Sequence, residues 1–237
     1  MELFNFTPAE ITALTLSIKV ALCSTAFILV PGIAIAWLLA RKNFPGKALL
    51  DGIVHLPLVL PPVVPGFLLL LLLGNQGVLG KWLQQHFAIS IAFTWIGAAV
   101  ASMVMALPLM VRAVKLAITQ VDTRLESAAQ SLGAQPLRVF FTVTLPLAMP
   151  GILTGLILAF SRSLGEFGAT ITFVGNIEGE TRTLPLAIYS YTQIPGGDIP
   201  AMRLVILSML IALAALMVSD VLERKATRRI GLGIALD

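Results

Sequence analysis

The chain has 237 residues, of which 57% are hydrophobic and only 12% are charged. A soluble domain carries roughly 25% charged residues, so this composition excludes an ordinary water-soluble domain. The formal net charge of +4 does not indicate nucleic-acid binding, because the basic residues form short clusters between long apolar runs. Such runs are typical of membrane spans, and the lipid bilayer is therefore the first partner that we predict.

Five charge-poor segments predict an all-α integral membrane protein with a single transmembrane domain over residues 1–237. Each segment approaches the ~20 apolar residues that a bilayer requires. In chain order, we place the spans near residues 12–40, 53–73, 88–111, 147–174 and 203–220. Prolines interrupt the second span, and the connections at about 74–88 and 175–202 are predicted outer loops, the second of them formed by turns.

The distribution of Lys and Arg predicts the orientation of the spans. Eleven of the sixteen basic residues fall in residues 41–51, 112–138 and 220–237. The positive-inside rule places these three segments in the cytoplasm. Because five spans put the two termini on opposite faces, we expect the N-terminus outside and the C-terminus inside.

The chain shows no site for chemistry of its own. Neither Gly46-Lys47-Ala48 nor Gly80-Lys81-Trp82 has the upstream glycine and the following Ser or Thr that a phosphate-binding loop needs. His55 has no second histidine or carboxylate at ligand spacing, and Cys23 is the single cysteine. We therefore expect no catalytic residues, no metal site and no enzyme activity. Active transport would take its energy from another chain or from an ion gradient.

Residues 124–151, RLESAAQSLGAQPLRVFFTVTLPLAMPG, form the largest predicted cytoplasmic loop. Leu125, Ala128, Ala129 and Leu132 fall on one face of a helix, and Gly133 supplies a C-terminal stop. On spacing alone, this segment is equally an amphipathic connector that lies on the membrane surface.

The same loop resembles the EAA loop of ABC importer permeases. The family pattern is Glu-Ala-Ala, three residues, Gly, nine residues, Ile, one residue and Leu-Pro. This sequence follows it in register, with Val143 at the isoleucine and Leu145-Pro146 at the Leu-Pro, but Ser127 stands at the usual glutamate and Glu126 lies one residue earlier. The resemblance implies an ATPase-coupling site at Glu126, Ser127, Ala128, Ala129, Leu132, Gly133, Leu145 and Pro146.

The resemblance covers about residues 14–220 and implies the type I ABC importer permease fold, with five transmembrane helices and a coupling loop at 122–146. It implies an ABC ATPase subunit dimer as partner, which would bind ATP and Mg, whereas this chain would hold no cofactor. A second permease copy, most simply as a homodimer, would complete the pathway. The implied location is the bacterial cytoplasmic (inner) membrane.

Two further stretches, 44–66 and 161–185, resemble molybdate importer permeases, and the glycine-glutamate-aromatic-glycine element at 165–168 also resembles sulfate permeases. The resemblance implies molybdate as cargo, with tungstate by the same route and sulfate or thiosulfate as the alternative. A periplasmic or extracellular molybdate-binding protein would supply the recognition of the oxyanion.

The fourth span carries two ionisable residues, Arg162 and Glu166, which share a helical face and can pair. Charges in a span usually face the bundle interior or a water-filled path. One interpretation is that Arg162 attracts a dianion while Glu166 moderates its binding; the other is an internal ion pair that holds this span against its neighbours. The candidate pathway residues are Arg162, Glu166, Gly168, Thr170, Pro61 and Pro62.

Two other classes of function remain as alternatives. An ion-coupled secondary transporter would need inverted repeats, and no repeat is visible in the sequence. An integral membrane enzyme would need a cluster of catalytic side chains, which two isolated histidines cannot supply.

Overall fold

The computed structural model describes the backbone of residues 6–234 and the side chains of residues 6–218 and 221. Every regular element in this part of the chain is a helix. The elements are α1 (Pro8–Arg41), α2 (Lys47–Val59), α3 (Val63–Leu73), α4 (Val78–Phe87), α5 (Trp95–Gln120), α6 (Thr123–Ser131), α7 (Pro136–Val139), the π-helix η2 (Phe140–Thr144), α8 (Leu145–Leu147), α9 (Met149–Leu164), α10 (Gly168–Val174), α11 (Leu184–Thr192) and α12 (Asp198–Ile234).

Three helices are long and apolar enough to cross a membrane unaided: α1, α5 and the Asp198–Val218 part of α12. Two bent pairs add up to two more spans. The first joins α2 to α3 with a bend of 113°, and the second joins Pro136–Leu147 to α9 with a bend of 71°. The fold is therefore all-α, with up to five spans in the described residues, as the charge-poor segments predict.

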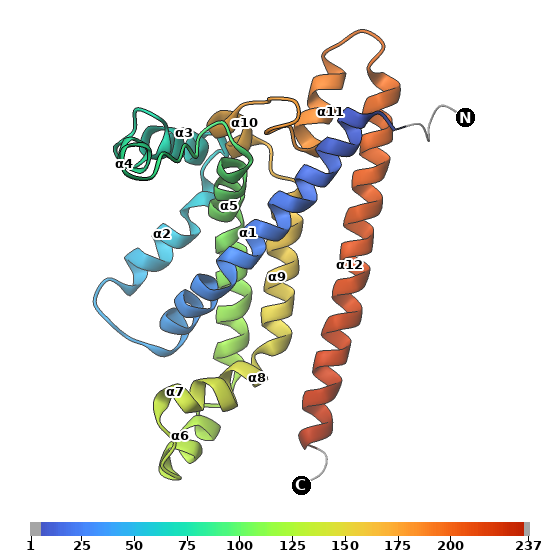
Figure 1. Ribbon diagram of the computed structural model, residues 1–237. Coiled ribbons are helices and arrows are strands. Elements are labelled where there is room, and N and C mark those ends of the chain that lie inside the picture. Colours follow the sequence, from blue (N-terminus) through green and yellow to red (C-terminus); the bar gives the residue numbers. More distant parts are fainter. Residues whose placement is uncertain (1–5, 235–237) are drawn as a thin grey trace.

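Helix α1 lies across α5 and α9 (Figure 1). Its start is fixed by a capping box: the Glu10 backbone N–H donates to Thr7 Oγ1 at 3.3 Å, and the Thr7 N–H donates to a Glu10 carboxylate oxygen at 2.6 Å. Further along, Gly32 packs against the Met110 side chain of α5. The Ser24 hydroxyl donates to Ser163 Oγ of α9 at 3.0 Å. Small residues thus let three helices approach closely, as is common in membranes.

Helix α12 is held mainly at its first turns. Arg203 and the buried Glu10 carboxylate form an ion pair at 2.9 Å, which joins the start of α12 to the start of α1. Only 11% of the apolar window of α12 is buried, and its later turns stand apart from the bundle (Figure 1).

The two ends of the bundle carry different elements. The first turns of α1 lie beside α11 at one end, whereas α6, α7 and the last turns of α12 lie at the other (Figure 1). Helix α11 has nine residues within the segment 175–202, where the turn residues predict no helix. Its start is held by the Leu184 N–H, which donates to Ser17 Oγ of α1 at 2.6 Å.

Two helix boundaries differ from the predicted spans. Helix α5 starts at Trp95, later than residue 88, because the Thr94 side chain caps it by accepting from the Gly97 N–H. It also continues to Gln120, well beyond residue 111. The predicted segment 147–174 contains two helices, α9 and α10, with a break at residues 165–167.

Candidate functional site

Helix α6 stands at the exposed end of the bundle and contains no buried residue. Its first turn is capped by Asp122, whose carboxylate accepts from the Arg124 N–H at 2.9 Å. Its end is set by Gly133, which adopts a φ of +87° in the left-handed region that suits glycine. The predicted helix with a glycine stop is therefore confirmed.

One side of α6 presents apolar groups to the outside. Leu125 is 50% exposed and Leu132 is 90% exposed, and Ala128 between them is also exposed. We call these three residues the exposed face of α6. In the adjoining α7 and η2, Leu137 and Phe141 are likewise more than half exposed. Apolar groups that gather on a projecting element are typical of a surface that another protein covers.

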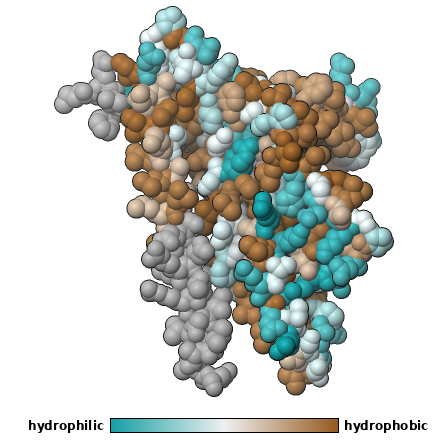
Figure 2. Space-filling model, turned by 180° about the vertical axis from the view of Figure 1, so that it is seen from behind, coloured by the Kyte–Doolittle hydropathy of each residue, from teal (hydrophilic) through white to brown (hydrophobic). Residues whose placement is uncertain are grey.

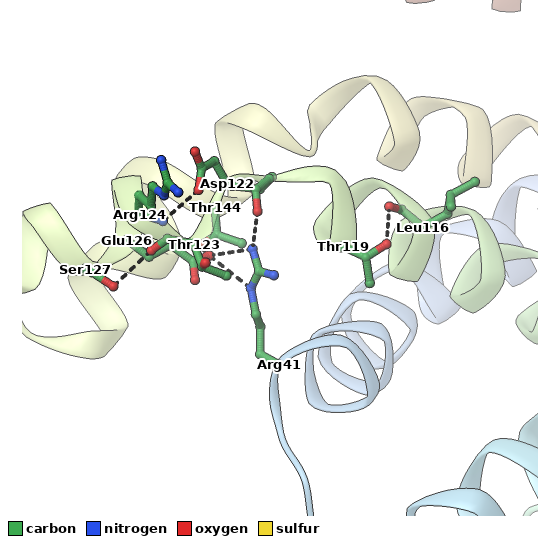
Figure 3. A network of polar contacts seen from close by, with 10 residues as sticks. Arg41, Leu116, Thr119, Asp122, Thr123, Arg124, Glu126, Ser127 and Thr144 are labelled. Carbon is green, nitrogen blue, oxygen red and sulfur yellow. Dashed lines mark hydrogen bonds and ion pairs between the residues drawn. The ribbon is translucent and has the colours of Figure 1, made fainter.

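Glu126 points away from that face and into the protein (Figure 3). Its Oε1 accepts from Arg41 Nε at 3.2 Å and from Arg41 Nη2 at 3.0 Å. The same oxygen accepts from the Thr144 hydroxyl at 2.6 Å. Arg41 also donates to the Val121 carbonyl at 3.0 Å. We call Arg41, Glu126 and Thr144 the Arg41 cluster, and it connects α6 to the last residue of α1.

The other predicted coupling residues surround this cluster without joining it. The Ser127 hydroxyl donates to the Thr123 carbonyl within α6 (Figure 3). Ala129 is half-buried, and Gly133 is exposed. Leu145 and Pro146 form the short helix α8, which precedes the bend into α9. A contact between any of these residues and an ATPase stays a prediction.

Sequence reasoning did not find Arg41 or Thr144 as members of this site. In the sequence, Arg41 indicates only the topology of the spans. It lies 85 residues before Glu126 and meets it only in the folded chain. A second contact supports the same junction, since Trp37 of α1 and Phe140 of η2 have ring centroids 5.9 Å apart.

The candidate pathway residues gather where two helices break. Arg162 and Glu166 form an ion pair at 2.5 Å, which confirms the pairing predicted from their spacing. Glu166 is 2% exposed, and its second carboxylate oxygen accepts from the Ala169 N–H at 2.8 Å, so it also starts α10. Gly168 lies so close to Pro62 that an added Cβ would be 2.6 Å from the Pro62 Cβ. The break between α2 and α3 therefore packs on the break between α9 and α10.

Thr170 and Pro61 complete this group. Thr170 is 1% exposed, and its hydroxyl has no hydrogen-bond partner among the described residues. Pro61 lies in the turn between α2 and α3 and accepts from the Val64 N–H at 2.8 Å. The buried Glu166 carboxylate caps α10 and pairs with Arg162. Of the two interpretations of these residues, this arrangement fits the internal ion pair that holds the span against its neighbours.

One sequence-based expectation about His55 is wrong. Asp51 lies one helical turn earlier, and its carboxylate is 3.3 Å from His55 Nδ1. The same carboxylate accepts from Lys115 Nζ at 2.8 Å, which connects α2 to α5. Within the described part of the chain, no three His, Cys, Asp or Glu side chains gather at metal-binding distance.

Three curated relatives are similar along nearly the whole chain. The molybdenum transport system permease protein ModB of Haemophilus influenzae is 52% identical over 228 residues, which cover 96% of this chain and 100% of that protein. ModB of Escherichia coli is 55% identical over 225 residues, which cover 95% of this chain and 98% of that protein. The sulfate transport system permease protein CysT of Salmonella typhimurium is 36% identical, covering 94% of this chain and 80% of that protein.

The helix arrangement also matches solved structures. The inward-facing MetNI methionine ABC transporter superposes with a TM-score of 0.71 at 18% identity, covering 91% of this chain and 95% of the matched chain. The fold is thus that of type I ABC importer permeases. Residues 32–228 match the family described as binding-protein-dependent transport system inner membrane component. With this match and the identity to ModB proteins over almost the full length, the chain belongs to that family of multi-pass inner membrane transport proteins.

Proposed function

We propose that this chain is the permease subunit of an ABC importer that carries molybdate, and tungstate by the same route, into the bacterial cytoplasm. A separate ATPase subunit dimer would supply the energy by docking on α6. The observation that carries the proposal is the sequence identity to two ModB proteins, which is 52% and 55% over almost the whole chain. The exposed apolar face of α6 adds to it, because it offers a surface for the ATPase. Sulfate is the alternative cargo, and the sulfate permease is the more distant relative.

The proposed orientation places α6, α7 and the end of α12 in the cytoplasm. These elements share one end of the bundle (Figure 1), and they contain basic residues that the positive-inside rule keeps in the cytoplasm. The opposite end, with α4, α11 and the start of α1, would face the binding protein. An ATPase and an external binding protein would then act on opposite ends of the same helices.

The proposed cycle follows from this placement. Closure of two ATPase subunits on ATP would move the α6 helices of two permease copies together, and the bundles would swing from an inward-facing to an outward-facing state. The Arg41 cluster offers a route for this motion, because it joins α6 to α1, and α1 lies across α5 and α9. Each copy would line half of the pathway.

The experiment is the ATPase activity of the complete importer in vesicles, with its binding protein loaded in turn with molybdate, tungstate or sulfate. We expect molybdate and tungstate to stimulate hydrolysis and sulfate to leave the basal rate unchanged. If only sulfate stimulates hydrolysis, the cargo is sulfate and not molybdate. No response to any oxyanion would reject the proposed class of substrate.

A further inference from the structure

A groove of about 660 Å³ runs along one side of α5 and α9 toward α6. On α5, Val111, Val114 and Ile118 are buried in the core that includes residues of α1 and α2. Arg112 and Leu116 lie on the opposite side of the same helix, where they line the groove. The groove therefore faces away from α1.

The two helices that line the groove are in close contact. A Cβ added to Gly151 of α9 would overlap with the Ala117 Cβ of α5. One turn further along, an added Cβ at Gly155 would meet the Met110 sulfur at 2.8 Å. Glycine at these positions brings the helices together, so that the longer side chains on either side form the walls.

Arg112 contributes the positive charge of this groove, and Asp122 at its α6 end contributes the negative one. Arg112 is exposed and forms no ion pair or hydrogen bond with any residue that the structure describes. The polar residues that share the lining are Gln120, Asp122 and Thr154. Of these, Asp122 already accepts the capping hydrogen bond at the mouth of the groove. Arg162, in contrast, is paired with Glu166 and does not line the groove.

Arg112 is the first residue of the segment 112–138, which the distribution of basic residues assigns to the cytoplasmic side. It lies eight residues before the end of α5, which is about 12 Å of helix at 1.5 Å per residue. An unpaired charge at the inner end of a span is costly in lipid, so it usually faces water or another protein chain. Figure 2, which shows the face opposite α1, has hydrophilic side chains that reach from the α6 end toward the middle of the molecule.

We infer that Arg112 is an anion-binding residue in the inner half of the transport pathway and that its ligand is the tetrahedral oxyanion dianion that the importer carries. The inference rests on the proposed function and assigns a residue to it. In a symmetric pair of copies with facing grooves, two guanidinium groups would donate to one dianion, and the two Asp122 carboxylates at the α6 end would limit how tightly it is held. Guanidinium donors suit such oxygens geometrically. Because few other donors line the groove, the anion is held weakly and can leave.

The test compares Arg112→Gln and Arg112→Lys importers in vesicles, with Lys42→Gln as the control. Lys42 is an exposed cation in the loop after α1 and outside the groove. We expect Arg112→Gln to lower molybdate uptake on the order of ten-fold, which is the scale for removing one unit charge a few ångströms from a dianion in a wet groove. Hydrolysis of ATP should continue, and both Arg112→Lys and Lys42→Gln should keep most of the uptake. An Arg112→Gln importer with wild-type uptake would overturn the inference.

Chemical rescue tests the charge itself. The single cysteine, Cys23, is replaced by serine, and Arg112→Cys is then added. Modification with ethylammonium methanethiosulfonate should restore uptake, whereas the ethylsulfonate reagent should not. Equal restoration by the two reagents would show that bulk, not charge, matters at this position and would overturn the inference.

The vesicle composition separates the cargo from a lipid phosphate as ligand. The Arg112→Gln defect should be the same in phosphatidylcholine vesicles with and without phosphatidylglycerol. A defect confined to the anionic vesicles would assign Arg112 to a lipid headgroup and overturn the inference. If vesicles with the wild-type importer accumulate no molybdate, the proposed function is rejected as well. If they do accumulate it and the Arg112→Gln importer accumulates it equally well, this inference alone is rejected.

Discussion

Besides Glu10, two glutamates in the described part of the chain hold their carboxylates away from water and use them inside the protein. The Glu166 side chain is 1% exposed and pairs with Arg162, while that of Glu126 is 15% exposed and pairs with Arg41. Each carboxylate also accepts a further hydrogen bond, Glu166 from the Ala169 N–H and Glu126 from the Thr144 hydroxyl of η2. Removing either arginine leaves a carboxylate without its counter-charge, which costs more than the pair itself contributes.

This imbalance makes a prediction for Arg162. Arg162→Ala should destabilise the permease by about 3 kcal/mol, because the buried Glu166 carboxylate loses its partner. The thermal unfolding of the purified importer in detergent measures the change. The double variant Arg162→Ala with Glu166→Gln should recover most of the loss, since the buried charge is then gone. A stable Arg162→Ala protein with slow uptake would instead favour a direct role for Arg162 in the pathway.

Leu132 allows a complementary prediction, because its side chain is 90% exposed. Leu132→Asp should leave the thermal stability of the permease alone unchanged. It should strongly reduce assembly with the ATPase, since docking would bury an unpaired charge. Co-purification of the two subunits measures assembly. Gln130→Asp, an exposed position on the other side of α6, is the matched control and should assemble normally. Normal assembly of Leu132→Asp would remove the exposed face of α6 from the docking surface.

At the level of helices, the Arg41 cluster determines how α6 is joined to the bundle. Helix α6 buries none of its own residues, so packing alone does not hold it. The hydrogen bonds of Glu126 to α1 and η2, together with the contact of Trp37 with Phe140, replace that packing. Through these contacts, a movement of α6 would reach α1.

Glu126→Gln and Arg41→Gln should each separate ATP hydrolysis from transport. Hydrogen bonds to charged groups contribute about 1.5–3 kcal/mol, and their loss would let α6 move without α1. We expect more ATP hydrolysed per molybdate transported in both single variants. The double variant should be no worse than either single one, because both changes remove the same contact. Strictly additive defects would indicate that the two residues act separately.

The sequence predicts local features of these elements well and their long-range contacts poorly. The Arg162–Glu166 pair and the Gly133 stop follow from spacings of a few residues. The contact of Gly168 with Pro62 and that of Arg41 with Glu126 join segments that no period in the sequence connects. Helix α11 lies among turn residues, and its start depends on a hydrogen bond from a distant helix. The Arg112 groove needs the relative placement of α5 and α9, which follows only from their packing.

For the whole molecule, the central question is which end of the bundle faces the cytoplasm. In a Cys23→Ser background, Lys81→Cys in α4 and Arg138→Cys in α7 place one exposed thiol at each end. We expect a membrane-impermeant maleimide to label the Lys81→Cys protein in intact cells. The Arg138→Cys protein should react only after the membrane is opened. The reverse pattern would invert the orientation and remove α6 from reach of an ATPase.

The most direct test of the account is ATP-driven accumulation of labelled molybdate in vesicles that contain this permease with its ATPase and binding protein. We predict uptake against a concentration gradient that requires both ATP and the binding protein. Excess tungstate should compete with molybdate, and excess sulfate should not. Accumulation that continues without ATP and collapses when an ion gradient is dissipated would contradict the account and identify a secondary transporter.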